Sequence, residues 1–136
     1  MPDNAINMNA NQPFIDHQNK VVVRVRLRGS WTTGNHQEVM LTLADGTLVR
    51  ISRTNGSDTF QIGAQEAGAS RNPMATLIQT NVPAAGPTCR DALAAFGTVH
   101  RNFPRYEQAD CHEFARRFYL ELIPNAVGFP VEEEFM

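Results

Sequence analysis

Cys111 is the side chain of this sequence best suited to covalent chemistry, because it lies at the start of a predicted helix. Apolar residues recur at helical spacing from Cys111 to Ile123, and Asp110 precedes them with Glu113 three residues later, a pattern typical of helix N-termini. The free N–H groups of a first helical turn favour a thiolate and lower a cysteine pKa from about 8.5 by one to several units. Cys111 is therefore predicted to be a nucleophile, and the alternative is a buried cysteine that only packs.

The other cysteine and three of the four histidines carry weaker indications. Cys89 also begins a predicted helix, and we favour a buried or bridging cysteine there; a Cys89–Cys111 disulfide would consume the nucleophile. His100 ends that helix, where the helix dipole alone attracts histidine. His112 points about 100° away from Cys111 around its helix, and His17 falls in the N-terminal segment. The histidines are dispersed, and there is no HExxH motif or glycine-rich phosphate loop, so no metal and no cofactor are predicted.

The composition predicts one folded domain and excludes several classes of protein. A chain of 136 residues and 15.1 kDa, with 42% hydrophobic and 19% charged residues, is typical of a single globular domain. The net charge of -2 and the pI near 6.0 offer no excess of positive charge for nucleic acid. No apolar run approaches the roughly 20 residues of a membrane span, and the N-terminus lacks the pattern of a signal peptide. We expect a cytoplasmic protein, or one exported without a cleavable signal peptide, with no integral membrane segment.

The first half of the chain predicts a flexible leader followed by an antiparallel meander. Residues 1–19 are rich in Asn, Gln, Asp and Pro and have no sustained apolar period, so we place the single domain at 20–136. The alternation after Lys20 predicts a strand with one face made of Val21, Val23, Val25 and Leu27 and the other of Arg24, Arg26 and Arg28. Segment 36–53 predicts two strands about a turn at Asp45-Gly46, and Asn55-Gly56 precedes a further strand, TFQIGA.

The second half of the chain predicts helices. Asn72-Pro73 is typical of a helix start, which predicts a short helix through MATLIQT, residues 74–80. Thr88 can cap a second helix over 89–100, and the helix that starts at Cys111 ends before Pro124. Strands followed by helices predict an α+β domain in which an antiparallel meander packs against two to three helices.

The string around Cys111 resembles a known motif. The sequence DCHEFA, residues 110–115, with Phe118-Tyr119 one turn later, resembles the Asp-Cys-Ser-Gly-Phe-Val…Tyr string that opens the nucleophile helix of NlpC-type papain-like cysteine peptidases. His112-Glu113 stand where that family usually has Ser-Gly. Ordinary members place the catalytic histidine after the cysteine, whereas no histidine follows His112 here. The order therefore resembles the circularly permuted branch, which includes the lecithin retinol acyltransferase-like and PPPDE-like enzymes.

The resemblance implies a catalytic pair. In the permuted enzymes the histidine lies upstream on a strand that is followed by a turn and a second strand, and His36 opens such a block in this sequence. His36 shares its strand parity with Glu38 and not with the apolar Val39. A pair of Cys111 with His36 therefore requires the helix of Cys111 to cover the start of this strand, or a bulge there.

The resemblance also implies a third group that orients the imidazole. In the permuted enzymes this is a polar residue on the second strand, which implies Ser52. Arg50 cannot accept a hydrogen bond from the ring and would instead suit an anionic substrate group. Asp45 in the turn is the remaining candidate.

The implied function is a cysteine-dependent hydrolase or acyltransferase that cleaves an amide, isopeptide or acyl ester through a thioester. The substrates that the resemblance implies are peptides, peptidoglycan, as for an amidase or peptidase effector, and acyl lipids. The alternative is a non-catalytic module that binds a protein partner through the face of Arg24, Arg26 and Arg28 together with Trp31.

Overall fold

The computed structural model describes residues 5–8, 11–32, 36–54, 57–65, 75–103 and 110–129, which form six strands and three helices. In chain order the elements are β1 (Ala5–Met8), α1 (Asn11–His17), β2 (Val22–Gly29), β3 (Gln37–Leu43), β4 (Leu48–Thr54), β5 (Ser57–Ile62), β6 (Ala75–Asn81), α2 (Cys89–Asn102) and α3 (Asp110–Leu122).

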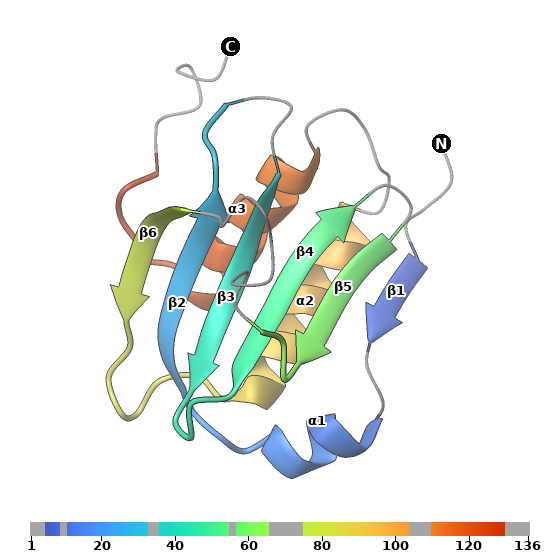
Figure 1. The fold of residues 1–136 in the computed structure, drawn as a ribbon, viewed down its shortest axis with the longest axis vertical. Coiled ribbons are helices and arrows are strands. Elements are labelled where there is room, and N and C mark those ends of the chain that lie inside the picture. Colours follow the sequence, from blue (N-terminus) through green and yellow to red (C-terminus); the bar gives the residue numbers. More distant parts are fainter. Residues whose placement is uncertain are drawn as a thin grey trace.

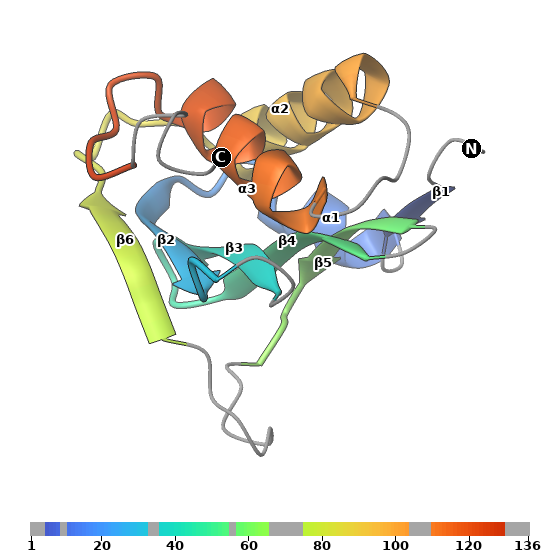
Figure 2. The ribbon, with the colours of Figure 1, turned by 90° about the horizontal axis from the view of Figure 1, so that it is seen from above.

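Four consecutive strands, β2 to β5, form the centre of one sheet, and each pairs antiparallel with its neighbour in sequence. β6 adds antiparallel to β2 and β1 adds parallel to β5, which gives the order β1-β5-β4-β3-β2-β6 (Figure 1). Figure 2 shows α2 and α3 together on one side of this sheet. The predicted α+β class, with an antiparallel meander packed against helices, is confirmed.

A bulge near the start of β2 changes which valines face the helices. The pairing of β2 with β3 shifts register just after Val22, so Val22 and Val25 are both fully buried although they are three residues apart. The predicted face, which included Val21 and Val23, is wrong before the bulge, where these two side chains are only half-buried. It is confirmed after the bulge at Val25 and Leu27.

The segment predicted as a helix after Asn72-Pro73 is a strand. β6 pairs antiparallel with β2, and its central residue, Ile78, is buried on the helix side of the sheet. The prediction is wrong because a run this short does not separate a helical period from a strand period, and the pairing with β2 decides. The β-branched Thr76, Ile78 and Thr80 also suit a strand. Both turn signals, Asn55-Gly56 and Asn72-Pro73, lie outside the described residues.

The two long helices lie where they were predicted, and α2 starts at its predicted cap. The Thr88 side chain accepts from the Asp91 N–H, and the Asp91 carboxylate accepts from the Thr88 N–H, so α2 begins with a capping box. The apolar face of α3 is fully buried at Phe114, Ala115, Phe118 and Tyr119. α3 packs against α2 and, within the sheet, mainly on β3 and β4, so the helix lies over the middle of the sheet.

Residues 1–19, predicted as a flexible leader, contain two regular elements, β1 and α1. β1 pairs with β5 at the edge of the sheet, and Phe14 of α1 is half-buried against the core. The Gln18 carbonyl accepts from the Arg90 N–H at 2.9 Å, which joins the end of this segment to α2. The lack of an apolar period in this segment therefore did not mean a lack of regular structure.

We expect deletion of residues 1–19 to lower the free energy of unfolding by about 2 kcal/mol, because the deletion removes Phe14 from the core. The thermal midpoint should fall by roughly 4–8 °C, as measured by circular dichroism. Ile15→Ala is the matched control, since Ile15 is 54% exposed and its loss should leave the midpoint nearly unchanged. An unchanged midpoint after the deletion would show instead that 20–136 is a complete folding unit.

Candidate active site

Cys111 lies in the first turn of α3, where its side chain is half-buried and its sulfur is not part of a disulfide. Cys89 begins α2 at the opposite end of the pair of helices (Figure 1) and is not part of a disulfide either. The alternative of a Cys89–Cys111 disulfide is therefore wrong, and the nucleophile candidate is not consumed.

Cys89 is a packing residue. It is fully buried in the core, and this burial raises the pKa of its thiol to about 11. At pH 7 to 8 the thiol is almost entirely protonated and therefore a poor nucleophile. The interpretation of Cys89 as a buried cysteine is confirmed, and Cys111 is the cysteine that solvent can reach.

His36 directly precedes β3 and is half-buried. Burial has the largest effect on its imidazole and lowers the pKa below the ordinary 6.5, so the ring is neutral at pH 7. Glu38 raises this pKa, and His112 and Arg50 lower it. Because His112 follows Cys111 in α3, the start of β3 and the first turn of α3 share one electrostatic neighbourhood. A direct contact between His36 and Cys111 stays a prediction.

The backbone of His36 is held against the end of β2. Gly29 has a φ of +128°, and a Cβ at this position would lie 2.2 Å from the His36 carbonyl oxygen. Only glycine permits this approach. Gln37, which pairs with Gly29, is 2% exposed, and its side-chain amide donates to the Ser30 carbonyl at 2.8 Å. The end of β2 therefore fixes where His36 enters the sheet.

Glu38 is a buried carboxylate held between two arginines from neighbouring strands. Arg28 Nη1 of β2 lies 3.3 Å from Glu38 Oε2, and Arg50 Nε of β4 lies 3.2 Å from Oε1. Arg50 also donates to the Gln65 carbonyl at 2.7 Å. Both arginines are thus already engaged by groups of the protein, including Arg50, which had been considered for an anionic substrate group.

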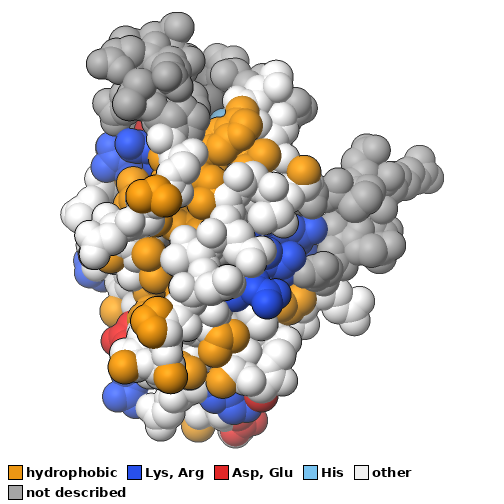
Figure 3. Space-filling model, turned by 90° about the vertical axis from the view of Figure 1, so that its left-hand side faces the viewer, with side chains coloured by type: hydrophobic (Ala, Val, Ile, Leu, Met, Phe, Trp, Pro, Cys, Tyr) orange, Lys and Arg blue, Asp and Glu red, His pale blue; other side chains and the backbone are white. Residues whose placement is uncertain are grey.

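The alternative docking surface is only partly exposed. Arg24 is exposed, Arg26 is half-buried, and Arg28 is 3% exposed in its pair with Glu38. Trp31 is half-buried and packs against the core. Figure 3 shows the β6 side of the molecule, where basic side chains form separate groups among polar and hydrophobic ones. The prediction that Arg28 is an exposed part of this surface is therefore wrong.

Two residues had been considered for orienting the imidazole, and they lie in different places. Ser52 is 5% exposed in β4, where it pairs with Thr59 of β5; its contact with His36 stays a prediction. Asp45 lies in the β3–β4 turn, with the length of β3 between it and His36. Hydrogen bonds from Lys20 and from the backbone nearby hold the pKa of Asp45 well below its ordinary value. Asp45 therefore stabilises the turn and does not orient His36.

A buried charge cluster that the sequence analysis missed joins β4, β5 and α2. Arg53 and Asp58 are both fully buried, with Arg53 Nε 2.6 Å from Asp58 Oδ1 and Arg53 Nη2 2.8 Å from Oδ2. His100 Nδ1 lies 2.7 Å from Asp58 Oδ2, and Arg53 also donates to the Phe103 carbonyl. The sequence interpretation assigned His100 to the helix dipole alone and missed its carboxylate. This cluster ties the end of α2 to the sheet.

A sequence signal for this cluster existed. Arg53 lies two residues after Ile51, and Asp58 lies two residues before Phe60, so the period of two places both charges on the buried face of their strands. Two oppositely charged residues at buried positions of adjacent strands indicate an ion pair, because a buried charge requires a partner.

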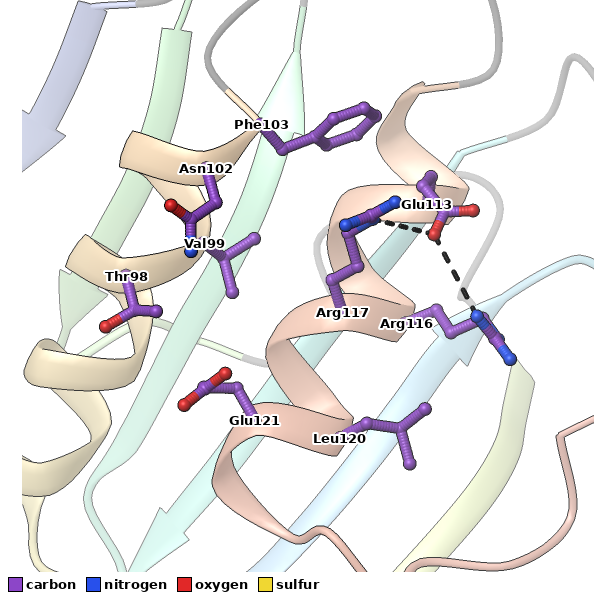
Figure 4. A pocket seen from close by; sticks show the side chains of 9 residues that line it. All are labelled: Thr98, Val99, Asn102, Phe103, Glu113, Arg116, Arg117, Leu120 and Glu121. Atoms are coloured by element: carbon purple, nitrogen blue, oxygen red, sulfur yellow. Dashed lines mark hydrogen bonds and ion pairs between the residues drawn. The ribbon is translucent and has the colours of Figure 1, made fainter.

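A pocket of about 380 Å³ lies between α2 and α3 (Figure 4). Phe103, directly after α2, and Glu113 and Arg117 from α3 are among its lining residues, and Arg117 Nε donates to Glu113 at 2.9 Å. Neither Cys111 nor His36 lines this pocket, so it is separate from the candidate active site.

Within the described part of the chain, no helix combines the length and the apolar character needed to cross a membrane. No group of three His, Cys, Asp or Glu side chains there is placed to hold a metal ion. Comparisons with models of protein families, with curated proteins and with solved structures found no match to this chain.

Proposed function

We propose that this protein is a cysteine-dependent hydrolase or acyltransferase of the permuted papain-like type, with Cys111 as nucleophile and His36 as base. The observation that supports the proposal is that His36 is within electrostatic range of His112, in the first turn of the helix that carries Cys111. His36 is neutral at pH 7 because burial lowers its pKa, so it can accept the thiol proton. The N–H groups of the first turn of α3 favour the thiolate.

In the proposed reaction, the thiol proton of Cys111 passes to His36 as the sulfur bonds to the substrate carbonyl carbon. The carbonyl oxygen becomes negatively charged, and N–H groups at the start of α3 stabilise it. The bond to the leaving group breaks as His36 returns the proton to the leaving amine or alcohol, and a thioester remains on Cys111. Water, or an acceptor alcohol or amine, then gives a proton to His36 and attacks the thioester. The acyl group leaves, and the proton returns to Cys111.

Amides, isopeptides and acyl esters all react through such an intermediate, and peptidoglycan cross-links belong to the first group. A cytoplasmic location would favour isopeptides or acyl lipids, and export would favour peptidoglycan. Hydrolysis and acyl transfer differ only in whether water or another acceptor attacks the thioester. A panel of model amides and acyl esters, assayed with and without an added amine acceptor, separates these outcomes.

Alkylation by iodoacetamide at a series of pH values tests the nucleophile. We expect Cys111 to be labelled much faster than Cys89 at neutral pH, and we expect Cys111→Ala to remove the rapid labelling, because the pKa of Cys89 is about 11 and its thiol stays protonated. Peptide mass spectrometry assigns the label to one cysteine. Cys89→Ala is the matched control and should keep the rapid reaction. Rapid labelling that persists in Cys111→Ala would refute the proposal.

A further inference from the structure

We propose that the outer edge of β6 is an interaction surface that pairs antiparallel with β6 of a second copy of this chain, so that two sheets join about a two-fold axis. β6 is the last strand of the sheet, and in the described part of the chain it pairs with β2 alone (Figure 1). This surface lies apart from Cys111 and His36, and the inference does not depend on the proposed reaction.

The register of β6 determines which of its backbone groups point away from the sheet. The Val82 N–H donates to the Val23 carbonyl at 3.0 Å, so the backbone groups of Val82 face β2. This direction alternates along a strand, and the backbone groups of Thr80 therefore face β2 as well. Gln79 and Asn81, on either side of Thr80, point their N–H and C=O groups outward. An outward row of this kind is a template for a further strand.

β6 lacks the charges and prolines that keep many edge strands single. Its seven residues, ATLIQTN, include neither a charged side chain nor a proline. The shift of register between β2 and β6 comes before Ile78, so the segment from Ile78 to Asn81 pairs regularly. The opposite edge of the sheet is β1, which has only four residues, and a very short edge strand is a poor template. β6 is therefore the edge that is suited to pairing.

The absence of charge favours a second copy as the partner. In an antiparallel pair about a two-fold axis a strand meets its own residues, so charged side chains would come close to their own copies. β6 brings no such repulsion, and it has no charge with which to select a charged strand of another protein. With Thr80 on the axis, Gln79 of each copy lies opposite Asn81 of the other. The outward N–H and C=O groups of these residues can then exchange hydrogen bonds.

An exposed apolar side chain lies beside the same edge. Gly128 is against β6, since a Cβ at Gly128 would lie 3.6 Å from the Ile78 side chain. The adjacent Val127 is 81% exposed, and among the described residues it is one of two exposed large hydrophobic side chains. Figure 3, seen from the β6 side, shows further hydrophobic side chains on this face between separate basic groups. Apolar groups with few charges are typical of the centre of a homodimer interface.

Sedimentation velocity over a range of protein concentrations tests the pairing. We expect the wild type to reach twice the 15.1 kDa of one chain. Gln79→Pro should raise the dimer Kd about tenfold or more, because proline has no N–H for the partner strand, while the inward bonds to β2 remain. Gln79→Ala is the matched control: it loses the same side chain but keeps the N–H, so it should remain a dimer.

A second variant keeps the test valid if Gln79→Pro does not fold. Gln79→Lys/Asn81→Lys leaves the backbone groups intact but places lysines opposite lysines across the axis, so this variant should sediment as a monomer. Ile15→Lys adds a charge at an exposed position of α1, away from β6 (Figure 1), and should stay a dimer. Thermal melting by circular dichroism verifies that each variant is folded.

Hydrogen exchange locates the interface. The outward amides of Gln79 and Asn81 should exchange more slowly as the protein concentration rises, because the partner strand then accepts their hydrogen bonds. A wild type that stays monomeric at millimolar concentration would overturn the inference, and an extended segment of another protein would be the remaining kind of partner for this edge. A dimer that persists in both the proline and the lysine variants would overturn it as well, since the two copies would then meet elsewhere.

Discussion

Replacing Asp58 with alanine should lower the free energy of unfolding by about 3–5 kcal/mol, because the substitution leaves the guanidinium of Arg53 buried without its carboxylate. Both side chains are 0% exposed, so water cannot take the place of the lost partner. His100 loses its hydrogen-bond partner at the same time. For a domain of 136 residues this loss lowers the thermal midpoint by roughly 10–20 °C, measurable by calorimetry.

Three further variants show whether the uncompensated charge is the cause. Asp58→Asn keeps the shape of the side chain and one hydrogen-bond acceptor, so its thermal midpoint should lie between those of the wild type and Asp58→Ala. Asp45→Ala is the matched control, because Asp45 pairs with Lys20 at the surface and such pairs contribute little. The double variant Arg53→Met/Asp58→Leu removes both charges and should recover much of the lost stability. A midpoint for Asp58→Ala equal to that of Asp45→Ala would contradict this account.

The second large effect concerns His36. Substituting His36→Ala should lower the rate of acyl transfer by about 10²–10⁴, the usual contribution of a positioned proton carrier. Alkylation of Cys111 should slow as well, because its thiol loses the proposed proton acceptor. The folded state should be largely preserved, since His36 is only half-buried. Hydrolysis of a chromogenic acyl ester measures the rate, with Cys111→Ser as the inactive reference.

His100→Ala is the matched histidine variant for this measurement. It should lower stability through the loss of its bond to Asp58, while the rate per folded molecule stays close to that of the wild type. Ser52→Ala tests the third group that the resemblance implied. If His36→Ala kept its full rate while His100→Ala lost it, the proton acceptor would belong to α2 and the assignment of His36 would be wrong.

The parts of the fold that follow from local pattern could be predicted from the sequence. The turn at Asp45-Gly46 is set by residues next to it, and so is the capping box at Thr88. β6 and β1 depend on pairing with strands far away in the sequence, and the hydrophobic pattern within a segment does not indicate which distant strand it pairs with. The bulge after Val22 likewise depends on the register of β3.

The candidate site was predictable to a similar extent. Cys111 stands out from its position in the helix, and His36 from the order of elements in the resembling family. The close approach at Gly29 was not visible in the sequence, because it depends on which residue lies across the ladder. The pair of Arg53 and Asp58 was missed because charged residues rarely occupy the buried face of a strand. Their spacing of two residues from the apolar Ile51 and Phe60 nevertheless indicated that they lie on that face.

The strand order also determines how the sheet assembles and how it opens. The central strands β2 to β5 join sequence neighbours through short connections, whereas the two outer pairings join residues as distant as Ala5 with Ser57 and Gly29 with Ala75. Closing long loops costs entropy, so we expect the four central strands to form early and the outer strands to add late. In the folded molecule, we expect the outer strands to be the first to detach. Departure of β6 would uncover the edge of β2, the strand that carries Arg28 and Gly29, so the surroundings of His36 should loosen before the centre of the sheet does.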